Sequence, residues 1–205
     1  MNRLEVPARL APADGDRIRV ALLDGQVLIY PTDTLYALGG LVLDAAAAAR
    51  VRAAKGREDA KPLPAVAADL DQVGTLCARL EGPARAAAEA FWPGPLTLVL
   101  PASRAVPEGV TSGTGTIAVR VPDRELTRAL CRLAGPLVST SANRAGDTPP
   151  VTCAAAIAAV GGLAAWAIDG GEGAPQPSTI VDATGPVPRL LRAGAVPWEK
   201  VQSVW

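Results

Sequence analysis

Short apolar runs alternate with longer stretches that carry the spacing of helices. The runs predict buried strands at 27–30, 41–43, 64–67, 96–100, 116–121, 136–139, 164–168, 178–182 and 189–191. The longer stretches predict helices at 16–24, 44–55, 69–80, 83–92, 124–133, 152–160 and 198–201. Gly25 is typical of a helix end and Asp44 of a helix start. The pattern predicts an α/β fold of mixed type, a twisted mixed sheet with helices packed on it.

The organisation along the chain predicts one domain. No internal repeat, low-complexity linker or break in composition divides the 205 residues, so we expect a single domain over residues 1–205. The uncharged stretch 148–168 is long enough for a membrane span, but Pro149, Pro150 and a Gly-Gly pair interrupt it. We expect two short elements joined by a glycine turn there. The N-terminal residues lack the apolar core of a signal peptide, so we expect a cytoplasmic protein without membrane contact.

Composition excludes several kinds of chemistry. The chain has 20 basic and 20 acidic side chains and a formal net charge of zero, which argues against a strongly basic nucleic-acid-binding protein. It has no histidine, which excludes Ser-His-Asp and Cys-His nucleophile systems and histidine-based zinc sites. The widely spaced Cys77, Cys131 and Cys153 are typical of buried small side chains in a reducing compartment. We therefore expect any chemistry to use carboxylates, hydroxyls, lysine, arginine, backbone amides or a bound metal.

Polar residues gather where two of the predicted elements end. Residues 31–40 (PTDTLYALGG) follow the strand at 27–30, at the kind of position where open α/β sheets bind ligands. The alternative is a simple turn closed by an Asx hydrogen bond. Lys55 and Arg57 are two positions apart, so in extended backbone they point the same way, and Lys61 adds a third cation. They predict an anion site, with a solvated basic helix end as the alternative.

Three further segments carry candidate binding groups. Thr116 and Arg120 share one face of a predicted strand, and this arginine needs an anionic partner if it is buried. An exposed arginine on an edge strand is the alternative. The hydroxyl and amide groups of 139–146 (STSANRAG) suit phosphate or ribose contacts, unless they only cap a turn. Ser178 and Arg192 form a fifth group at neighbouring strand ends.

Taken together and in this order, these segments closely resemble the YrdC-like family of threonylcarbamoyl-AMP synthases, in its short, single-domain form. No common phosphate-loop motif is present. The resemblance rests on seven blocks: PTDTLYALG (31–39), KGREDAKPL (55–63), FWPGPLTLVL (91–100), TIAVRVP (116–122), STSAN (139–143), STIVDAT (178–184) and LLRAG (190–194).

The resemblance implies a YrdC-like fold with a basic concave cleft and a nucleotidyltransferase activity. L-threonine, bicarbonate and ATP, with Mg²⁺, would be condensed to threonylcarbamoyl-AMP and pyrophosphate. Downstream tRNA-modifying enzymes would use the product to make threonylcarbamoyladenosine, and weak binding of tRNA or other RNA belongs to the same expectation. The sequence identifies no protein ligand for the metal, which ATP phosphates would chiefly hold.

The resemblance also assigns roles to individual positions. Thr34, Arg120, Ser139 and Ser178 fall where the family holds L-threonine. A second set falls where the family holds ATP: Lys55, Arg57, Lys61, Thr116, Ser141, Asn143 and Arg192. Two alternatives stay open: a paralogue that binds nucleotides without threonine-dependent synthesis, and an RNA-binding module, although only 3% of the residues are aromatic.

Overall fold

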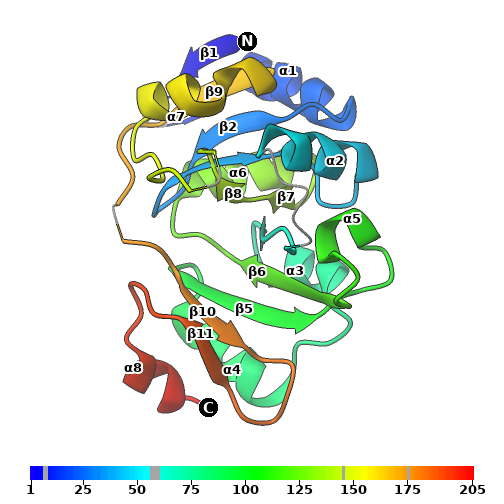
Figure 1. The fold of residues 1–205 in the computed structure, drawn as a ribbon, viewed down its shortest axis with the longest axis vertical. Coiled ribbons are helices and arrows are strands. Elements are labelled where there is room, and N and C mark those ends of the chain that lie inside the picture. The colour runs from blue at the N-terminus through cyan, green and yellow to red at the C-terminus, as the bar shows by residue number, and fades with distance from the viewer. Residues whose placement is uncertain (7–8, 56–60, 145, 175) are drawn as a thin grey trace.

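The computed structural model describes residues 1–6, 9–55, 61–144, 146–174 and 176–205, and Figure 1 shows its elements. The strands are β1 (Asn2–Glu5), β2 (Leu28–Pro31), β3 (Tyr36–Gly39), β4 (Ala65–Val66), β5 (Leu96–Pro101), β6 (Thr116–Arg120), β7 (Leu137–Val138), β8 (Thr140–Ser141), β9 (Trp166–Asp169), β10 (Thr179–Asp182) and β11 (Arg189–Arg192). The α-helices are α1 (Pro12–Leu23), α2 (Ala45–Ala54), α3 (Leu70–Leu76), α4 (Gly82–Phe91), α5 (Glu108–Thr111), α6 (Glu125–Ala134), α7 (Cys153–Val160) and α8 (Trp198–Gln202).

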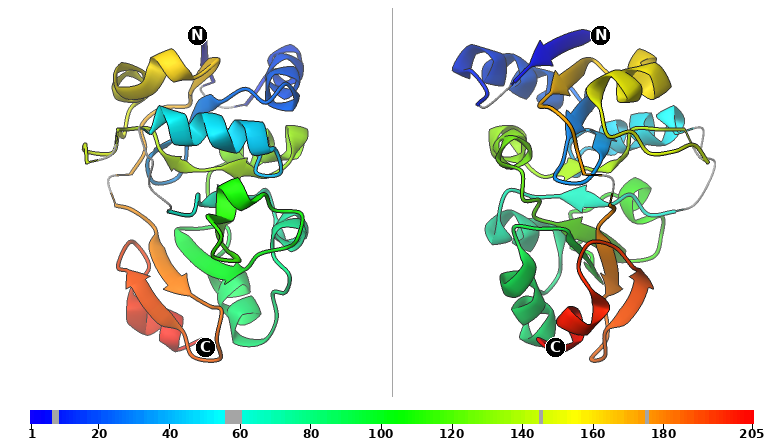
Figure 2. Two further views of the ribbon diagram at one scale, coloured as in Figure 1. Left: turned by 45° about the vertical axis from the view of Figure 1, so that its right-hand side comes forward. Right: turned by 90° about the vertical axis from the view of Figure 1, so that its left-hand side faces the viewer.

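The first sheet has the order β1-β9-β2-β3-β8 and is covered by helices on both faces. Side chains alternate along β2, so that Leu28 and Tyr30 pack with α1 and α6 whereas Ile29 packs with α2 and α7. Figure 2 shows these two helix pairs on opposite sides of the sheet. Burial on both faces explains why β2 reads as a continuous apolar run in the sequence.

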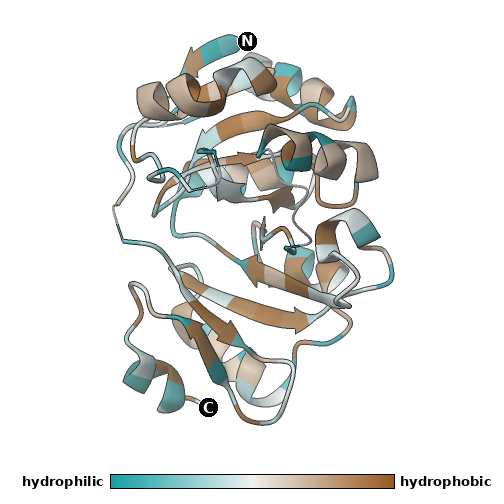
Figure 3. Cartoon of the chain, in the orientation of Figure 1, coloured by the Kyte–Doolittle hydropathy of each residue, from teal (hydrophilic) through white to brown (hydrophobic). Residues whose placement is uncertain are grey.

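The second sheet has the order β11-β10-β5-β6-β4-β7. Leu96 and Leu98 of β5 and Val119 of β6 are fully buried in the core that includes α3 and α4. The intervening residues Thr97 and Arg120 project from the opposite face by strand alternation. Figure 3 shows the apolar strands of both sheets, with the polar positions mostly at their ends and in the connections. From this face Arg120 reaches Asp33 in the first sheet's β2–β3 connection.

The chain passes directly from one sheet to the other at Ser139, which separates β7 from β8. The buried Tyr30 donates a hydrogen bond of 2.6 Å from Oη to the carbonyl oxygen of Val138. A Cβ at Gly39 would lie 1.6 Å from that same oxygen, so only glycine fits this close approach. The crossing at Ser139 is therefore held by close backbone packing and one buried hydrogen bond.

The predicted mixed α/β class is confirmed, with the strands divided between two sheets instead of one. Asp44 caps α2 as predicted, because its Oδ1 accepts hydrogen bonds from the amides of Ala46 and Ala47. Gly25 follows α1 with a φ of 71°, as expected for a glycine helix end. The three cysteines are free and buried, as predicted. None of the described helices combines the length and apolarity needed to cross a membrane.

Several predicted boundaries are wrong. The strand predicted at 41–43 does not form, and β3 lies instead within 31–40, where a loop was predicted, because Tyr36–Gly39 pairs antiparallel with β2. The predicted strand at 136–139 is shortened to β7, and β8 lies where a loop was predicted. Helix α3 ends at Leu76 because Cys77 forms a bridge with Ala102. The sequence reasoning also missed β1, α5 and the first turn of α1, which begins at Pro12.

Candidate functional site

The turn between β2 and β3 is closed by a threonine hydroxyl. Thr32 Oγ1 accepts hydrogen bonds of 3.2 Å from the amides of Thr34 and Leu35, and it lies 2.7 Å from the Leu35 carbonyl oxygen. Among the described residues, the Asp33 carboxylate accepts no backbone hydrogen bond, so the Asx turn considered as the alternative does not form. Thr32 therefore shapes the turn and leaves the Asp33 side chain for another partner.

That partner is Arg120, the last residue of β6. Its Nη1 lies 2.6 Å from Asp33 Oδ1, and the two side chains are only 7% and 12% exposed. Its Nη2 donates a 3.3 Å hydrogen bond to Oγ1 of the buried Thr34. Strand β6 lies between β5 and β4, so the alternative of an exposed arginine on an edge strand is wrong. The ion pair joins the second sheet to the turn of the first.

Ser178 and Arg192 lie at the ends of two neighbouring strands of the second sheet. Ser178 is buried just before β10, and its Oγ is 2.8 Å from Oγ1 of Thr97. Arg192 Nη2 donates to both the carbonyl oxygen and Oγ of Ser178, at 2.8 and 3.1 Å. Partial burial lowers the pKa of Arg192, and the positive charge of Arg120 lowers it further. Arg120 and Arg192 therefore contribute positive charge to the same region.

A second cluster forms at the end of α2. The Lys55 side chain is buried, with the residue 3% exposed, so the alternative of a solvated lysine is wrong. Its Nζ donates hydrogen bonds to the carbonyl oxygens of Ser141 and Asn143, at 2.7 and 2.5 Å, and to Asn143 Oδ1 at 3.2 Å. Asn143 in turn donates from Nδ2 to the Asp147 carbonyl oxygen at 2.6 Å. The lysine thus holds the segment that follows β8 against α2.

The other predicted site residues that the structure describes lie outside these two hydrogen-bonded clusters. Ser139 is half-buried at the crossing between the sheets, two positions before Ser141. Thr116 lies at the opposite end of β6 from Arg120, with its Oγ1 2.9 Å from that of Thr114. Lys61 is exposed, and its carbonyl oxygen accepts a 3.1 Å hydrogen bond from Arg52. Arg57 lies outside the described residues.

Four polar residues at the junction were missed as site residues. Asp33 was detectable in principle, since Arg120 was predicted to need an anionic partner. Thr97 and Thr32 carried no separate signal, because a single hydroxyl on a strand or turn is common. Arg124 donates to the carbonyl oxygens of Thr32, Gly170 and Glu172, and so links the turn to the segment after β9. Arg124 was missed because its three acceptors lie far from it in sequence.

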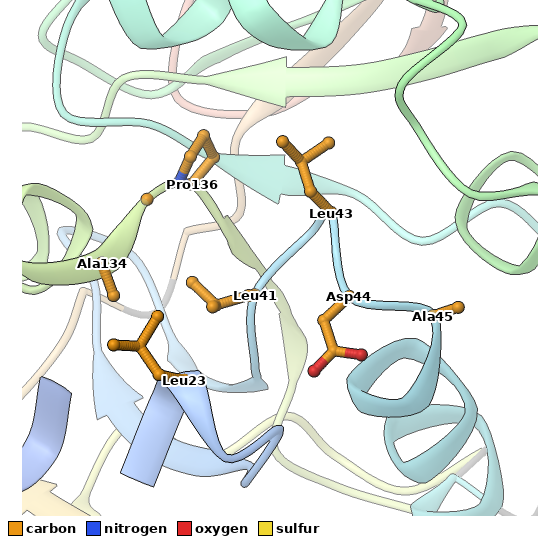
Figure 4. Close-up of a pocket in the computed structure, with 8 residues that line it drawn as sticks. Leu23, Leu41, Leu43, Asp44, Ala45, Ala134 and Pro136 are labelled. Atoms are coloured by element: carbon orange, nitrogen blue, oxygen red, sulfur yellow. The ribbon is translucent and has the colours of Figure 1, made fainter. Parts of the chain in front are cut away.

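A cavity of about 370 Å³ lies apart from these groups, where α1 ends and α2 begins (Figure 4). It contains none of the predicted site residues and is lined by Leu23, Leu41, Leu43, Asp44, Ala45, Ala134, Gly135 and Pro136. Its walls are mainly aliphatic, and Asp44 is already engaged in capping α2. The chemistry-bearing groups instead gather at the junction of the two sheets.

This junction has the groups that a small anionic ligand requires. Arg120 and Arg192 supply guanidinium N–H donors that match carboxylate or phosphate oxygens. Thr34, Thr97 and Ser178 add hydroxyl groups that either donate or accept hydrogen bonds. Within the part of the chain that the structure describes, no group of three or more His, Cys, Asp or Glu residues could hold a metal ion. The arrangement is suited to binding and orienting an anion with polar substituents.

Comparison with known proteins identifies the family. The family model Sua5_yciO_yrdC, described as "Telomere recombination", matches residues 20–194. This match covers most of the chain and includes the junction residues of both sheets. The chain belongs to the Sua5/YciO/YrdC family.

Individual relatives agree with this assignment. The chain is 38% identical over 193 residues to the threonylcarbamoyl-AMP synthase of Pyrococcus abyssi, covering 92% of this chain and 57% of that protein. It is 35% identical to a putative threonylcarbamoyl-AMP synthase of Mycobacterium tuberculosis, covering 90% of this chain and 85% of that protein. A crystal structure of P. abyssi Sua5 complexed with L-threonine superposes with a TM-score of 0.92 at 36% identity, covering 100% of this chain and 61% of that one. The chain therefore spans little more than half the length of the P. abyssi protein.

Proposed function

We propose that this protein is an L-threonylcarbamoyladenylate synthase. It would condense L-threonine, bicarbonate and ATP to threonylcarbamoyl-AMP and pyrophosphate. Relatives that carry this name match about nine-tenths of the chain, and the solved structure of one of them is complexed with L-threonine. The nucleotidyltransferase class of the enzyme and its role in tRNA modification are part of the same proposal.

The observation that carries the proposal is the group formed by Arg120, Thr34, Ser178 and Arg192 at the junction of the sheets. A threonine zwitterion needs a cation for its carboxylate and hydroxyl partners for its side chain. Arg120 supplies the cation, with the hydroxyl of Thr34 3.3 Å away. Ser178 directly precedes β10 and Arg192 ends β11, in the same sheet as Arg120. The burial of most of these groups strengthens their electrostatic interactions with a bound ligand.

ATP would occupy the neighbouring groups. Ser141 ends β8 and Asn143 lies two residues after it, and Lys55 holds their backbone in place. Arg192 extends the positive charge from the threonine groups toward a polyphosphate. We include Lys61, Thr116 and Ser139 in the proposed site on the family resemblance. Mg²⁺ would enter as part of the nucleotide substrate, because this ion commonly keeps phosphate and water ligands in phosphoryl-transfer sites.

The chemistry proposed for this site requires positioning and charge neutralisation. The threonine amine attacks the bicarbonate carbon and water leaves, and an oxygen of the resulting carbamate then attacks the α-phosphorus while pyrophosphate leaves. Transfers at phosphorus depend mainly on orientation and on stabilisation of developing negative charge. Arg192 and the threonine-binding Arg120 are among the described cations that would provide it. We propose no covalent intermediate with the protein.

Pyrophosphate release tests the proposal. The purified chain should release pyrophosphate from ATP and Mg²⁺ only when L-threonine and bicarbonate are both present. Arg192→Ala should weaken nucleotide interaction by about 1.5–3 kcal/mol, the range for a charged hydrogen bond. Arg85→Ala is the matched control, because Arg85 pairs with Glu89 on the exposed surface of α4. The control should behave like the wild type.

The other outcomes distinguish the alternatives. ATP binding without threonine-dependent release would contradict the synthase and favour a paralogous nucleotide-binding protein. RNA binding with steep salt dependence and no nucleotide turnover would favour the RNA-binding module. If synthesis occurs, mixing the chain with the downstream tRNA threonylcarbamoyl-transfer enzymes should convert tRNA adenosine to threonylcarbamoyladenosine.

A further inference from the structure

Asp33 is an almost buried carboxylate with few hydrogen-bond partners. An ionised carboxylate has two oxygens and about four acceptor sites. Among the described residues, Arg120 is the donor to this carboxylate, and it reaches Oδ1. Oδ2 receives no hydrogen bond from them. Because an uncompensated buried charge is costly, an unsatisfied oxygen at 12% side-chain exposure indicates a position for a further donor.

Arg120 has unused hydrogen-bonding capacity beside the same oxygen. A guanidinium carries five N–H donors. Its acceptors within the described chain are Asp33 Oδ1 and Thr34 Oγ1, so N–H groups remain for a ligand. A bound carboxylate on Arg120 would therefore lie next to the Asp33 carboxylate without displacing it. A positive group on that ligand would then have a negative partner at hydrogen-bonding range.

The charges at the junction fit such a ligand. Arg120 and Arg192 contribute two positive charges, and Asp33 contributes one negative charge between the turn of the first sheet and β6. This pattern is complementary to an α-amino acid, whose ammonium and carboxylate groups are attached to the same carbon. A simple carboxylate has no positive group of its own, so it would leave Asp33 Oδ2 without a partner.

We propose that Asp33 is a specificity-determining residue that binds the α-ammonium group of the amino acid whose carboxylate binds Arg120. The inference rests on the proposed function, which places L-threonine at this junction. Asp33 thereby selects α-amino acids over hydroxy acids of the same shape. The turn closed by Thr32 serves this selection, because it keeps the Asp33 side chain away from its own backbone.

The test compares L-threonine with (R)-3-hydroxybutanoate, which keeps the carboxylate, hydroxyl and methyl groups and lacks the amino group. Isothermal titration calorimetry gives the affinity of each for the wild type, Asp33→Asn and the control Asp123→Asn. Asp123 is an exposed aspartate 3.5 Å from Arg128, and its replacement makes the same change in net charge. The wild type and the control should prefer L-threonine by roughly 10- to 100-fold, the worth of one charged hydrogen bond.

Asp33→Asn should lose most of that preference, with weaker binding of L-threonine and unchanged or tighter binding of the hydroxy acid. A preference retained in Asp33→Asn overturns the inference. An equal loss of affinity for both ligands also overturns it, because it would mean that Asp33 only supports the fold. Asp33→Ser serves as a second variant if circular dichroism shows that Asp33→Asn is unfolded. If the wild type binds L-threonine and (R)-3-hydroxybutanoate with equal affinity, the inference is overturned without any variant. Threonine-dependent pyrophosphate release by the wild type separates failure of this inference from failure of the proposed function.

Discussion

The ion pair between Asp33 and Arg120 should couple the two sheets energetically. Its atoms are 2.6 Å apart, and both side chains are at least 88% buried, as the exposures of 7% and 12% imply. Removing one partner of a buried pair leaves an uncompensated charge and typically costs about 3–5 kcal/mol. Removing both partners leaves no such charge, so the double variant should cost much less than the sum of the single variants.

A double-mutant cycle measures this coupling. The variants are Asp33→Ala, Arg120→Met and the combination of the two. Each single change should lower the free energy of unfolding by about 3 kcal/mol, a large part of the roughly 5–15 kcal/mol of a typical domain. The coupling energy in the cycle should be about 2 kcal/mol or more, near the upper range for residues in direct contact. An exposed pair would give only about 0.2–1 kcal/mol.

Equilibrium unfolding in urea, followed by tryptophan fluorescence and by circular dichroism, provides the four free energies. Coincident transitions from the two probes justify a two-state treatment. Strictly additive single effects would refute the reasoning, because they would show that the two charges do not depend on each other. A double variant less stable than the sum of the single variants would refute it as well.

Three further predictions concern other parts of the molecule. Gly39→Ala should destabilise the protein by about 3 kcal/mol in urea, because its Cβ would lie 1.6 Å from the Val138 carbonyl oxygen, and wild-type stability would contradict this. Burial raises the pKa of Cys131 to about 12 and the other two cysteines are also buried, so a thiol reagent at neutral pH should react slowly until urea unfolds the chain. Burial alone would raise the pKa of Asp182, but hydrogen bonds, that from Arg189 foremost, bring it below its usual value. This lowered pKa stabilises the fold above the unfolded-state pKa of about 3.9, and the contribution is lost as the pH falls below that value and through the folded-state pKa. The free energy of unfolding of Asp182→Asn, measured in urea, should therefore fall less steeply with decreasing pH than that of the wild type.

The sequence predicted best those features that depend on near neighbours. Asp44 could be identified as a cap because its partners are the amides two and three positions later. The helices α4 and α6 lie within one residue of their predicted bounds, since their apolar spacing is local. Strand β3 was missed because Tyr36–Gly39 becomes a strand through pairing with β2 and β8, and its glycine and alanine have little strand propensity.

In the site, too, local features could be predicted and contacts between distant residues could not. The need of Arg120 for an anion followed from its place on an apolar strand, but its partner lies 87 positions earlier, in a turn of the other sheet. The hydrogen bonds from Lys55 to Ser141 and Asn143 likewise span 86 and 88 positions. Composition and spacing carry no information on such contacts. The family resemblance assigned Arg120 to threonine binding and Lys55, Ser141 and Asn143 to ATP binding, and these roles stay predictions.

A crystal structure of the chain grown with L-threonine tests the central claim most directly. We predict the threonine carboxylate within hydrogen-bond distance of the Arg120 guanidinium and its other polar groups near Thr34 and Ser178. The same density shows whether the ammonium group lies beside Asp33. Threonine bound elsewhere on the molecule, or an unchanged junction at saturating threonine, would contradict the account.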